Sequence, residues 1–202
     1  PVCISVQNVN VAVIGGNYSI DNGGNAGGIF GKLCLNTASY MIAFNNVDSG
    51  EAFQSTWTDT SVQGENYGAI AGQVVSSAIT NTLTVRDVRV ESAYVSGDNR
   101  TRFQGGLIGK LGGSAGEAVY LEVSNVNVKC TQPYAKNPMG FGGLVGCVAE
   151  GSILKMTDNV KIATTNDIYE GGGVVGYACA GSAAEFSGIT DTSEVRFRLY
   201  NN

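Results

Sequence analysis

Four carboxylates are the residues of this sequence that come nearest to enzyme chemistry. Glycoside hydrolysis usually needs a pair of acidic side chains around the bond that is cleaved, and Asp87, Glu91, Glu122 and Asp158 fall in or beside repeated strand-like segments. Basic residues are interleaved with these carboxylates along the chain. Such a mixture is typical of a solvated sheet face that carries cross-strand charge pairs. A polysaccharide-active enzyme is therefore an alternative hypothesis here. The interleaved basic residues are Arg86, Arg89, Lys129, Lys155 and Lys161.

A serine in a nucleophile-elbow pattern lacks the base that it would need. The segment GGSAG at 112–116 matches G-x-S-x-G, with Ser114 as the nucleophile. Activation of that hydroxyl normally requires a histidine, and the chain contains none. The pattern therefore predicts a polar turn, and Gly151-Ser152 and Gly181-Ser182 occupy comparable places further along the chain.

Glycine followed by lysine suggests a phosphate-binding loop, but the neighbouring residues do not fit. A P-loop needs a glycine five residues before its final glycine and a Ser or Thr after the lysine. Around Gly31-Lys32 those positions hold Ala26 and Leu33, and around Gly109-Lys110 they hold Gln104 and Leu111. A dinucleotide fingerprint fails at Val145, where its third glycine is required. The sequence predicts no cofactor.

The glycines belong to a repeat that sets the frame for all these residues. A segment that we call the glycine box, with glycine at its first and fifth positions, occurs as GGIFG (27–31), GAIAG (68–72), GGLIG (105–109), GGLVG (142–146) and GGVVG (172–176). This recurrence is typical of stacked units with loops of variable length. Its glycines are Gly27, Gly28, Gly31, Gly68, Gly72, Gly105, Gly106, Gly109, Gly142, Gly143, Gly146, Gly172, Gly173 and Gly176.

A second segment, the corner box, precedes each glycine box and follows the last. Its copies are ISVQNVNV (4–11), IAFNNV (42–47), LTVRDVRV (83–90), LEVSNVNV (121–128), MTDNVKI (156–162) and FSGI (186–189). Apolar residues at i, i+2, i+5 and i+7 predict two short strands joined by a corner. The residue before the second apolar pair is an Asn, Asp or Gly, which predicts a positive φ there. These residues are Asn8, Asn46, Asp87, Asn125, Asn159 and Gly188.

The two boxes together predict an all-β fold, a parallel β-solenoid of about five to six irregular coils in a single domain over residues 1–202. One unit cannot bury its apolar side alone, whereas stacked units pair each strand with its counterpart about 4.8 Å away. A β-sandwich is the main alternative. We expect the glycine box to be an apolar strand with one residue of each central pair facing inward. The pairs are Ile29-Phe30, Ile70-Ala71, Leu107-Ile108, Leu144-Val145 and Val174-Val175.

Composition restricts the partners and the compartment. A formal net charge of −5 disfavours nucleic acid as a partner, and no apolar run approaches the roughly 20 residues that span a bilayer. The chain starts at Pro1 without an initiator Met, which we interpret as a processed segment of a larger, secreted product. In that case Asn17 and Asn99, which begin N-x-Ser/Thr sequons, are candidate glycosylation sites.

Cysteine spacing disfavours a metal site. The five cysteines lack CxxC spacing and no histidine accompanies them, so a zinc site is not predicted. An odd count leaves at least one thiol free, buried or paired outside this segment. Cys3 with Cys34 is one pairing that the sequence allows, while Cys34 and Cys179 both stand three residues after a glycine box; the connectivity stays open. The others are Cys130 and Cys147.

The glycine boxes resemble a known motif. GGLVGCVAEGSI (142–153), GGLIGKLGGSAG (105–116) and GGVVGYACAGSA (172–183) are similar to the GLUG motif, a Gly-Leu-apolar-Gly repeat of large bacterial and protist cell-surface and secreted proteins. The GAIAG copy departs from it at Ala69 and Ala71. The resemblance implies extracellular location, β-solenoid architecture and roles in surface display or adhesion, and it transfers no catalytic residue.

The leading hypothesis is a non-enzymatic extracellular structural module, either a self-assembling fibre subunit or a segment of a surface adhesin. Strand edges at both ends of a stack need partners, which predicts end-to-end self-association through stacked coils or through the tail EVRFRLYNN (194–202). A carbohydrate-binding module is a further alternative, in which aromatic residues contact sugars instead of capping the inner column. These aromatics are Trp57, Tyr67, Tyr94, Phe103, Tyr134, Phe141 and Tyr169.

Overall fold

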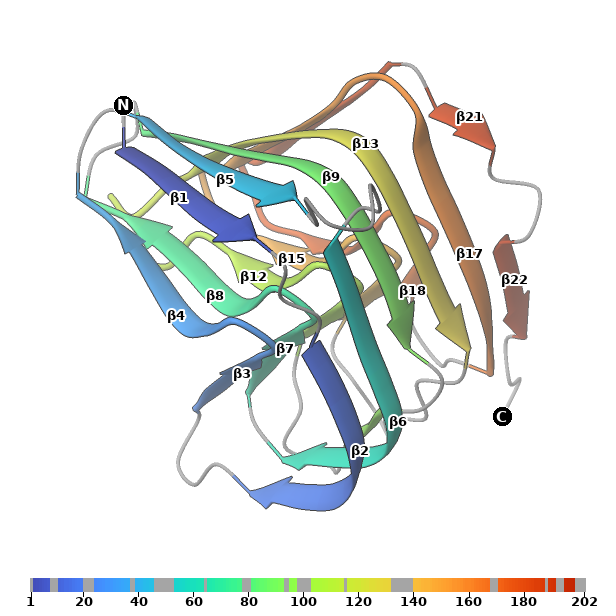
Figure 1. Cartoon of the computed structure of the whole chain (residues 1–202). Helices are drawn as coiled ribbons and strands as arrows, with labels where there is room; N and C mark the ends of the chain where they lie inside the picture. The colour runs from blue at the N-terminus through green and yellow to red at the C-terminus, as the bar shows by residue number, and fades with distance from the viewer. Residues whose placement is uncertain are drawn as a thin grey trace.

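The computed structural model shows an all-β chain, with no helix among the residues that it describes (Figure 1). Every pairing between the described strands is parallel. The described residues are 2–7, 11–19, 24–36, 39–45, 53–63, 65–77, 81–92, 95–97, 103–114, 116–131, 140–167, 171–187, 189–191 and 195–198.

The strands form three sheets, which we call A, B and C. Sheet B is β18 (Gly171–Gly172), β14 (Gly140–Gly142), β11 (Phe103–Gly105), β7 (Asn66–Gly68) and β3 (Asn25–Gly27). Sheet C is β19 (Val175–Ala178), β15 (Val145–Val148), β12 (Ile108–Leu111), β8 (Ala71–Ser76) and β4 (Phe30–Leu35). The main row of sheet A is β1 (Val2–Gln7), β5 (Ser39–Asn45), β9 (Thr82–Ser92), β13 (Tyr120–Thr131), β16 (Ile153–Met156) and β20 (Ala183–Phe186). It also contains β2 (Val11–Ser19), β6 (Phe53–Gln63), β10 (Val95–Gly97), β17 (Val160–Asp167), β21 (Ile189–Asp191) and β22 (Val195–Arg198).

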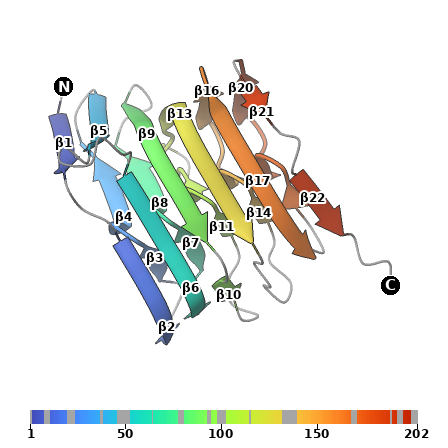
Figure 2. The ribbon, with the colours of Figure 1, turned by 45° about the vertical axis from the view of Figure 1, so that its right-hand side comes forward.

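Neighbouring strands in each sheet come from successive repeat units. Figure 2 shows this directly, because the colours step from blue to red across the sheet while the strands stay side by side. The all-β fold with parallel strands in stacked sheets is therefore confirmed, and it is consistent with a β-solenoid or β-helix. The repeat has a plain physical reason: each of the five units adds one strand to sheet B, one to sheet C and at least one to sheet A, so each unit must present the same residue types at the same places.

The corner boxes of the third to fifth units place apolar residues in register on sheet A. Leu121 pairs with Leu83 and Leu154, and Val126 pairs with Val88 and Val160. These side chains are buried in one cluster with those of the glycine boxes. The strands are longer than predicted, because β9 and β13 each run through the corner as one strand. In the next unit β16 and β17 lie on either side of it as two strands, as β1 and β2 and also β5 and β6 do in the first two units.

The first apolar pairs of the first two corner boxes are out of the predicted register, whereas Val11 is linked to Val90 through Ser55 as predicted. Ile4 pairs with Ile42, and Ile42 pairs with Val85, the second residue of its apolar pair, where the first was expected. Val88 pairs with Phe53 of β6, where Val47, which lies outside the described residues, was expected. The reason is that the two columns that contain Val85 and Val90 are joined by more residues in the first two units, from Ile4 to Val11 and from Ile42 to Ser55, than in the third.

Candidate functional site

Each glycine box forms a sharp bend between sheets B and C, so the expectation of a single apolar strand is wrong. The first glycine ends the sheet B strand, and the fifth residue is the second position of the sheet C strand. At the bend one carbonyl serves two donors, because the Leu144 C=O accepts hydrogen bonds from the N–H groups of Leu107 (2.9 Å) and Ile108 (3.1 Å). The parallel ladder therefore continues around the bend without loss.

Both members of the central apolar pair are buried in the three middle units. Leu107 and Ile108, like Leu144 and Val145, are almost wholly buried in the same apolar cluster. The expectation that only one residue of each pair faces inward is wrong, because the bend interrupts the alternation of side chains. The sharp turn gives the core twice the apolar residues that a straight strand would supply.

The last glycine of each box lies against backbone. A Cβ added at Gly146 would stand 2.6 Å from the Gln104 nitrogen, and one at Gly109 would stand 2.5 Å from the Tyr67 nitrogen. Both nitrogens belong to the sheet B strand of the preceding unit. Real Cβ atoms do not approach backbone so closely, so only glycine fits. The space beside these glycines is filled by protein, and a ligand cannot reach the backbone there.

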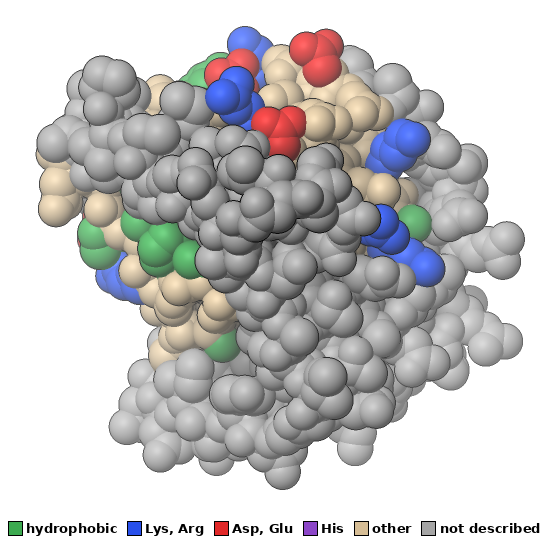
Figure 3. Space-filling view, in the orientation of Figure 1, with side chains coloured by type: hydrophobic (Ala, Val, Ile, Leu, Met, Phe, Trp, Pro, Cys, Tyr) green, Lys and Arg blue, Asp and Glu red, His purple; other side chains and the backbone are tan. Residues whose placement is uncertain are grey.

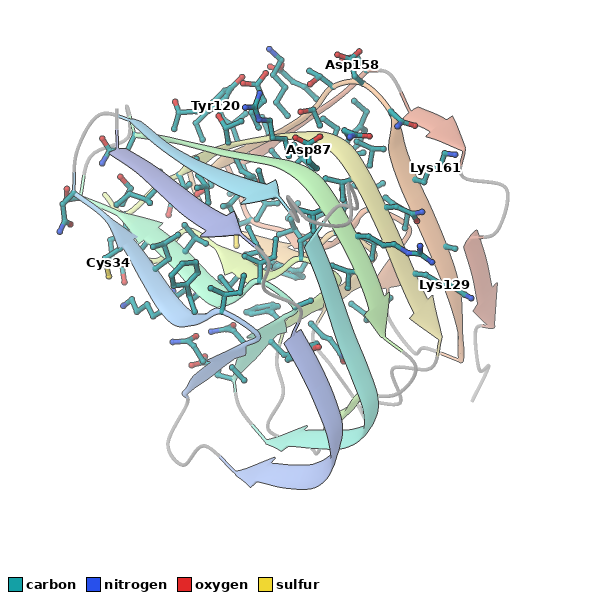
Figure 4. All side chains as sticks on the ribbon, in the orientation of Figure 1. Cys34, Asp87, Tyr120, Lys129, Asp158 and Lys161 are labelled. Carbon is teal, nitrogen blue, oxygen red and sulfur yellow. The ribbon has the colours of Figure 1, made fainter. Side chains whose placement is uncertain are left out.

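A column of polar side chains crosses the units at the corner of sheet A. Asp87, Asn125 and Asn159 have φ values of 60°, 49° and 50°, which confirms the predicted positive φ at these three positions; Asn8, Asn46 and Gly188 lie outside the described residues. Asn125 Nδ2 donates to Asp87 Oδ1 at 2.6 Å, and Asn159 Nδ2 donates to Asn125 Oδ1 at 2.7 Å. We call these three residues the corner ladder, and Figure 4 shows Asp87 projecting from it.

Two of the four acidic residues singled out from the sequence, Asp87 and Glu122, contact basic or amide groups. Asp87 lies 3.8 Å from Arg86, and Glu122 lies 3.7 Å from Lys155 of the next unit. Asp158 is exposed beside the corner ladder with a φ of 35°, and the Glu91 side chain lies outside the described set. Acidic and basic side chains lie close together on the upper part of the view in Figure 3. This arrangement is the expected charge-paired sheet surface.

Ser114 lies in a polar turn, as predicted. Its N–H donates to Glu117 Oε2 at 2.8 Å, and the Glu117 N–H donates to the Ser114 carbonyl at 3.0 Å. The comparable Ser152 is fully buried, where its hydroxyl accepts from the Val119 N–H at 3.1 Å. Both serines therefore act as parts of turns.

Three of the aromatics that precede glycine boxes are packed into the protein. Tyr67, Phe103 and Phe141 stand in sheet B and are buried. The centroid of the Phe103 ring lies 5.9 Å from that of Tyr177, and Lys110 Nζ lies 5.8 Å from the centroid of Phe103. These aromatics stabilise the stack. The side chain of Trp57 and the whole of Tyr94, Tyr134 and Tyr169 lie outside the described set, as do Asn99 and the side chain of Asn17 in β2.

Cys147 and Cys179, which belong to neighbouring units, contact each other. Burial of the Cys147 thiol, and next the neighbouring Cys179, raise the pKa of Cys147 from 9.0 to about 12. Cys34 is exposed, and these three cysteines are free thiols. A raised pKa disfavours the thiolate of Cys147, which is the reactive form.

Cys147 should resist alkylation in the native protein at pH 8. A pKa near 12 leaves about a thousandfold less thiolate than an ordinary thiol, so we expect iodoacetamide to modify Cys147 at least about a hundredfold more slowly than Cys34. Peptide mass spectrometry over time measures both rates, and they should converge in denaturant. The free energy of unfolding should fall as pH rises above 9.0, because the unfolded chain releases this proton first. Equal native rates would contradict the burial.

The two ends of the stack form a further candidate site, which no motif in the sequence marks. At one end β18, β19 and β20 are the last strands of their sheets, and at the other β3, β4 and β1 are. The last unit exposes Tyr177 (43%) and Phe186 (50%), whereas Tyr67, Phe103 and Phe141 of the earlier units are buried. These end strands present unpaired backbone groups together with apolar surface.

In the part of the chain that the structure describes, no group of three or more His, Cys, Asp or Glu side chains stands close enough to hold a metal ion. No helix there is long and apolar enough to cross a membrane. Compared with known proteins, the chain matches no protein-family model, and it has no significant match among curated proteins or solved structures.

Proposed function

We propose that the chain is a parallel β-solenoid of five to six irregular coils that serves as a non-enzymatic structural module, as a fibre subunit or as a segment of a surface adhesin. The observation that carries this proposal is the packing of the glycine boxes. A Cβ added at the last glycine of four boxes would stand no more than 2.6 Å from backbone of the preceding unit, so the most repeated feature of the sequence is used for stacking. A binding loop would need to occur only once.

The ends of the stack support assembly of copies end to end. Edge strands with unpaired N–H and C=O groups pair readily with other chains, and the last unit adds exposed Tyr177 and Phe186. The tail is a weaker route, because β22 already pairs with β17 of the same chain. Stacking of end strands is therefore the mode of self-association that we propose.

An extracellular or cell-surface location is part of the proposal. The resemblance of the glycine boxes to the GLUG motif and the sequons at Asn17 and Asn99 support it, because sequons are used only in a secretory pathway. The net charge of −5 fits a module without nucleic acid as a partner. Glycans are additional candidate partners, and we propose neither a cofactor nor insertion into a membrane.

Sedimentation velocity over a hundredfold range of protein concentration tests the assembly. We expect the mean sedimentation coefficient to rise with concentration, and electron microscopy of the concentrated sample to show rods one protein wide. A matched variant, Phe186→Asp, places a charge on the exposed end and should shift the rise to at least tenfold higher concentration. A single monomeric species at every concentration would overturn the fibre proposal.

A further inference from the structure

The sixth unit of the stack is only partly present. In five successive units, the strands of sheet A are followed by one strand of sheet B and one strand of sheet C. The sixth unit contributes β20, β21 and β22 to sheet A, and no strand of sheet B or C follows them among the described residues. The sequence after Gly188 contains no glycine, so it holds no further glycine box. Sheet A therefore extends one unit beyond sheets B and C, and Figure 2 shows β20, β21 and β22 at the red side of the molecule.

The contacts of the first glycine in each box show what is missing at this end. A Cβ added at Gly142 would stand 2.6 Å from the nitrogen of Gly176, the fifth residue of the next box, and the first and third boxes make the same contact with the boxes that follow them. At Gly172, in the last box, the three nearest atoms all belong to Val175 of the same box. The neighbour that Gly172 lacks is therefore the fifth glycine of one more box.

The inner surface of the stack is open at the same place. Val145 is wholly buried, but Val175, which pairs with it, is only partly buried. Met156 is wholly buried in the apolar cluster that includes the glycine boxes, whereas Phe186, which continues its column on sheet A, is 50% exposed. These positions are covered in earlier units by the apolar pair of the next glycine box. The uncovered surface is therefore the inner face on which such a pair packs.

The strand order restricts what can cover this surface. The place of the sixth unit in the main row of sheet A is already taken by β20, so an occupant with its own sheet A strand would collide with it. We propose that the open end binds one glycine box of another polypeptide chain, as a strand that pairs with β18, a bend, and a strand that pairs with β19. This inference rests on the solenoid proposed above, but it does not depend on self-association. The junction continues an interface that successive glycine boxes already make within the chain.

Addition of strands to open sheet edges has a known division of roles. Hydrogen bonds of the main chain give affinity, and the side chains that meet the receiving surface give specificity. Here two sheet edges are open side by side, so an incoming segment must bend between them as the glycine boxes do. A straight strand would pair with one edge only and would leave Val175 and Phe186 uncovered.

The internal register states which residues of the partner meet this end. Val145 and Val148 pair with Val175 and Ala178, so the fourth residue of the incoming box stands opposite Val175, and the residue two places after the box stands opposite Ala178. Apolar residues are expected at both places. The fifth residue faces the backbone at Gly171, which continues the column of sheet B that the fifth glycines of earlier boxes face. The partner motif is therefore G-x-Φ-Φ-G-x-Φ, where Φ is an apolar residue.

A peptide with the sequence of the third box tests the proposal. The probe is FQGGLIGKLG, residues 103–112, labelled with a fluorophore at its amino terminus and titrated with the full chain. We expect fluorescence anisotropy to show saturable binding of one peptide per chain, with a dissociation constant below about 1 mM. The control peptide carries Gly109→Ala and should bind at least tenfold more weakly, because the added methyl group would face backbone. Equal binding of the two peptides would overturn the proposed fit.

Two variants of the chain locate the site. Ala178→Asp places a charge opposite the apolar residue that follows the incoming box, and it should weaken binding of the probe at least tenfold. Ala180→Asp makes the same change two residues further on, at another exposed position beyond β19, and should leave binding within about twofold. Hydrogen exchange followed by mass spectrometry should slow in β18 and β19 when the peptide binds. Protection confined to β3 and β4, at the opposite end, would overturn the assignment.

The outcomes separate this inference from the proposed fibre. If the probe does not bind while sedimentation still rises with protein concentration, the binding of a glycine box is overturned and the assembly stands. Saturable binding by a chain that stays monomeric supports this inference and overturns the fibre. If Ala178→Asp does not fold, as judged by circular dichroism, the comparison of the two peptides on the unmodified chain decides.

Discussion

Replacing Gly146 with alanine is expected to lower the free energy of unfolding by about 3 kcal/mol or more, at the upper end for overpacking by one methyl group. The new Cβ would lie 2.6 Å from both the Gln104 nitrogen and the Gly109 oxygen. Gln104 stands in β11, which pairs with strands on both sides, so its backbone cannot retreat without breaking a ladder. Urea denaturation followed by circular dichroism measures the change.

Gly116→Ala is the matched control for this substitution. Nothing lies within 4 Å of a Cβ at Gly116, whose φ is +91°, so alanine there meets only backbone strain of about 1 kcal/mol. If the two variants lost equal stability, conformational preference alone would explain the glycines and the close approach of backbone would be unimportant. Gly143→Val should disrupt folding or assembly as Gly146→Ala does, because a Cβ at Gly143 would clash with the backbone carbonyl of Gly173 in the next unit.

Replacing Asn125 with valine is expected to lower the free energy of unfolding by about 2–3 kcal/mol. A β-branched residue at φ 49° is strained by about 1–2 kcal/mol, and both hydrogen bonds of the middle rung of the corner ladder are lost, each contributing about 0.5–1 kcal/mol at an exposed site. The same denaturation experiment measures the loss.

Two further variants separate these contributions. Asn125→Gly permits the positive φ and removes both side-chain bonds, so its cost should be about half that of valine. Asn127→Val, two residues along β13 at an exposed position, should change stability by less than about 0.5 kcal/mol. A cost at position 125 no larger than that at position 127 would show that the corner ladder contributes little.

Local patterns allowed the repeated parts of the fold to be predicted. Asn and Asp take positive φ more readily than other residues with side chains, so the recurrence of Asp87, Asn125 and Asn159 could be read as a corner without any contact information. The apolar spacing from Leu83 to Val90 and from Leu121 to Val128 likewise indicated which residues share the core face, because side chains alternate along a strand. The polar turn at Ser114 could be predicted because the chain has no histidine that could activate this serine as a nucleophile.

Other features depend on contacts between units and could not be predicted. The glycine box was expected to be an apolar strand. The sequence does not distinguish a glycine that flanks a strand from one that permits a bend or a close approach to backbone. The register of Ile4 and Ile42 was misjudged, because their units have more residues between the columns of Val85 and Val90 than the box spacing assumes. Cys147 and Cys179 contact each other although they stand at different distances after the glycine boxes of their units. Spacing along the sequence therefore could not predict this contact.

The sequence by itself determined that this chain is built from repeated β units stacked in parallel, because a unit that meets its own copies on both sides must present the same residues at the same places. Only the tertiary structure decided that the glycines let sheets B and C pack backbone against backbone, and that Gly31 and Gly172, at the two ends, lack the contacts with another unit that their counterparts in the middle units make. Those properties depend on which atoms of neighbouring units come within a few ångströms, and this distance is set by the packing of whole sheets rather than by the order of residues along one strand.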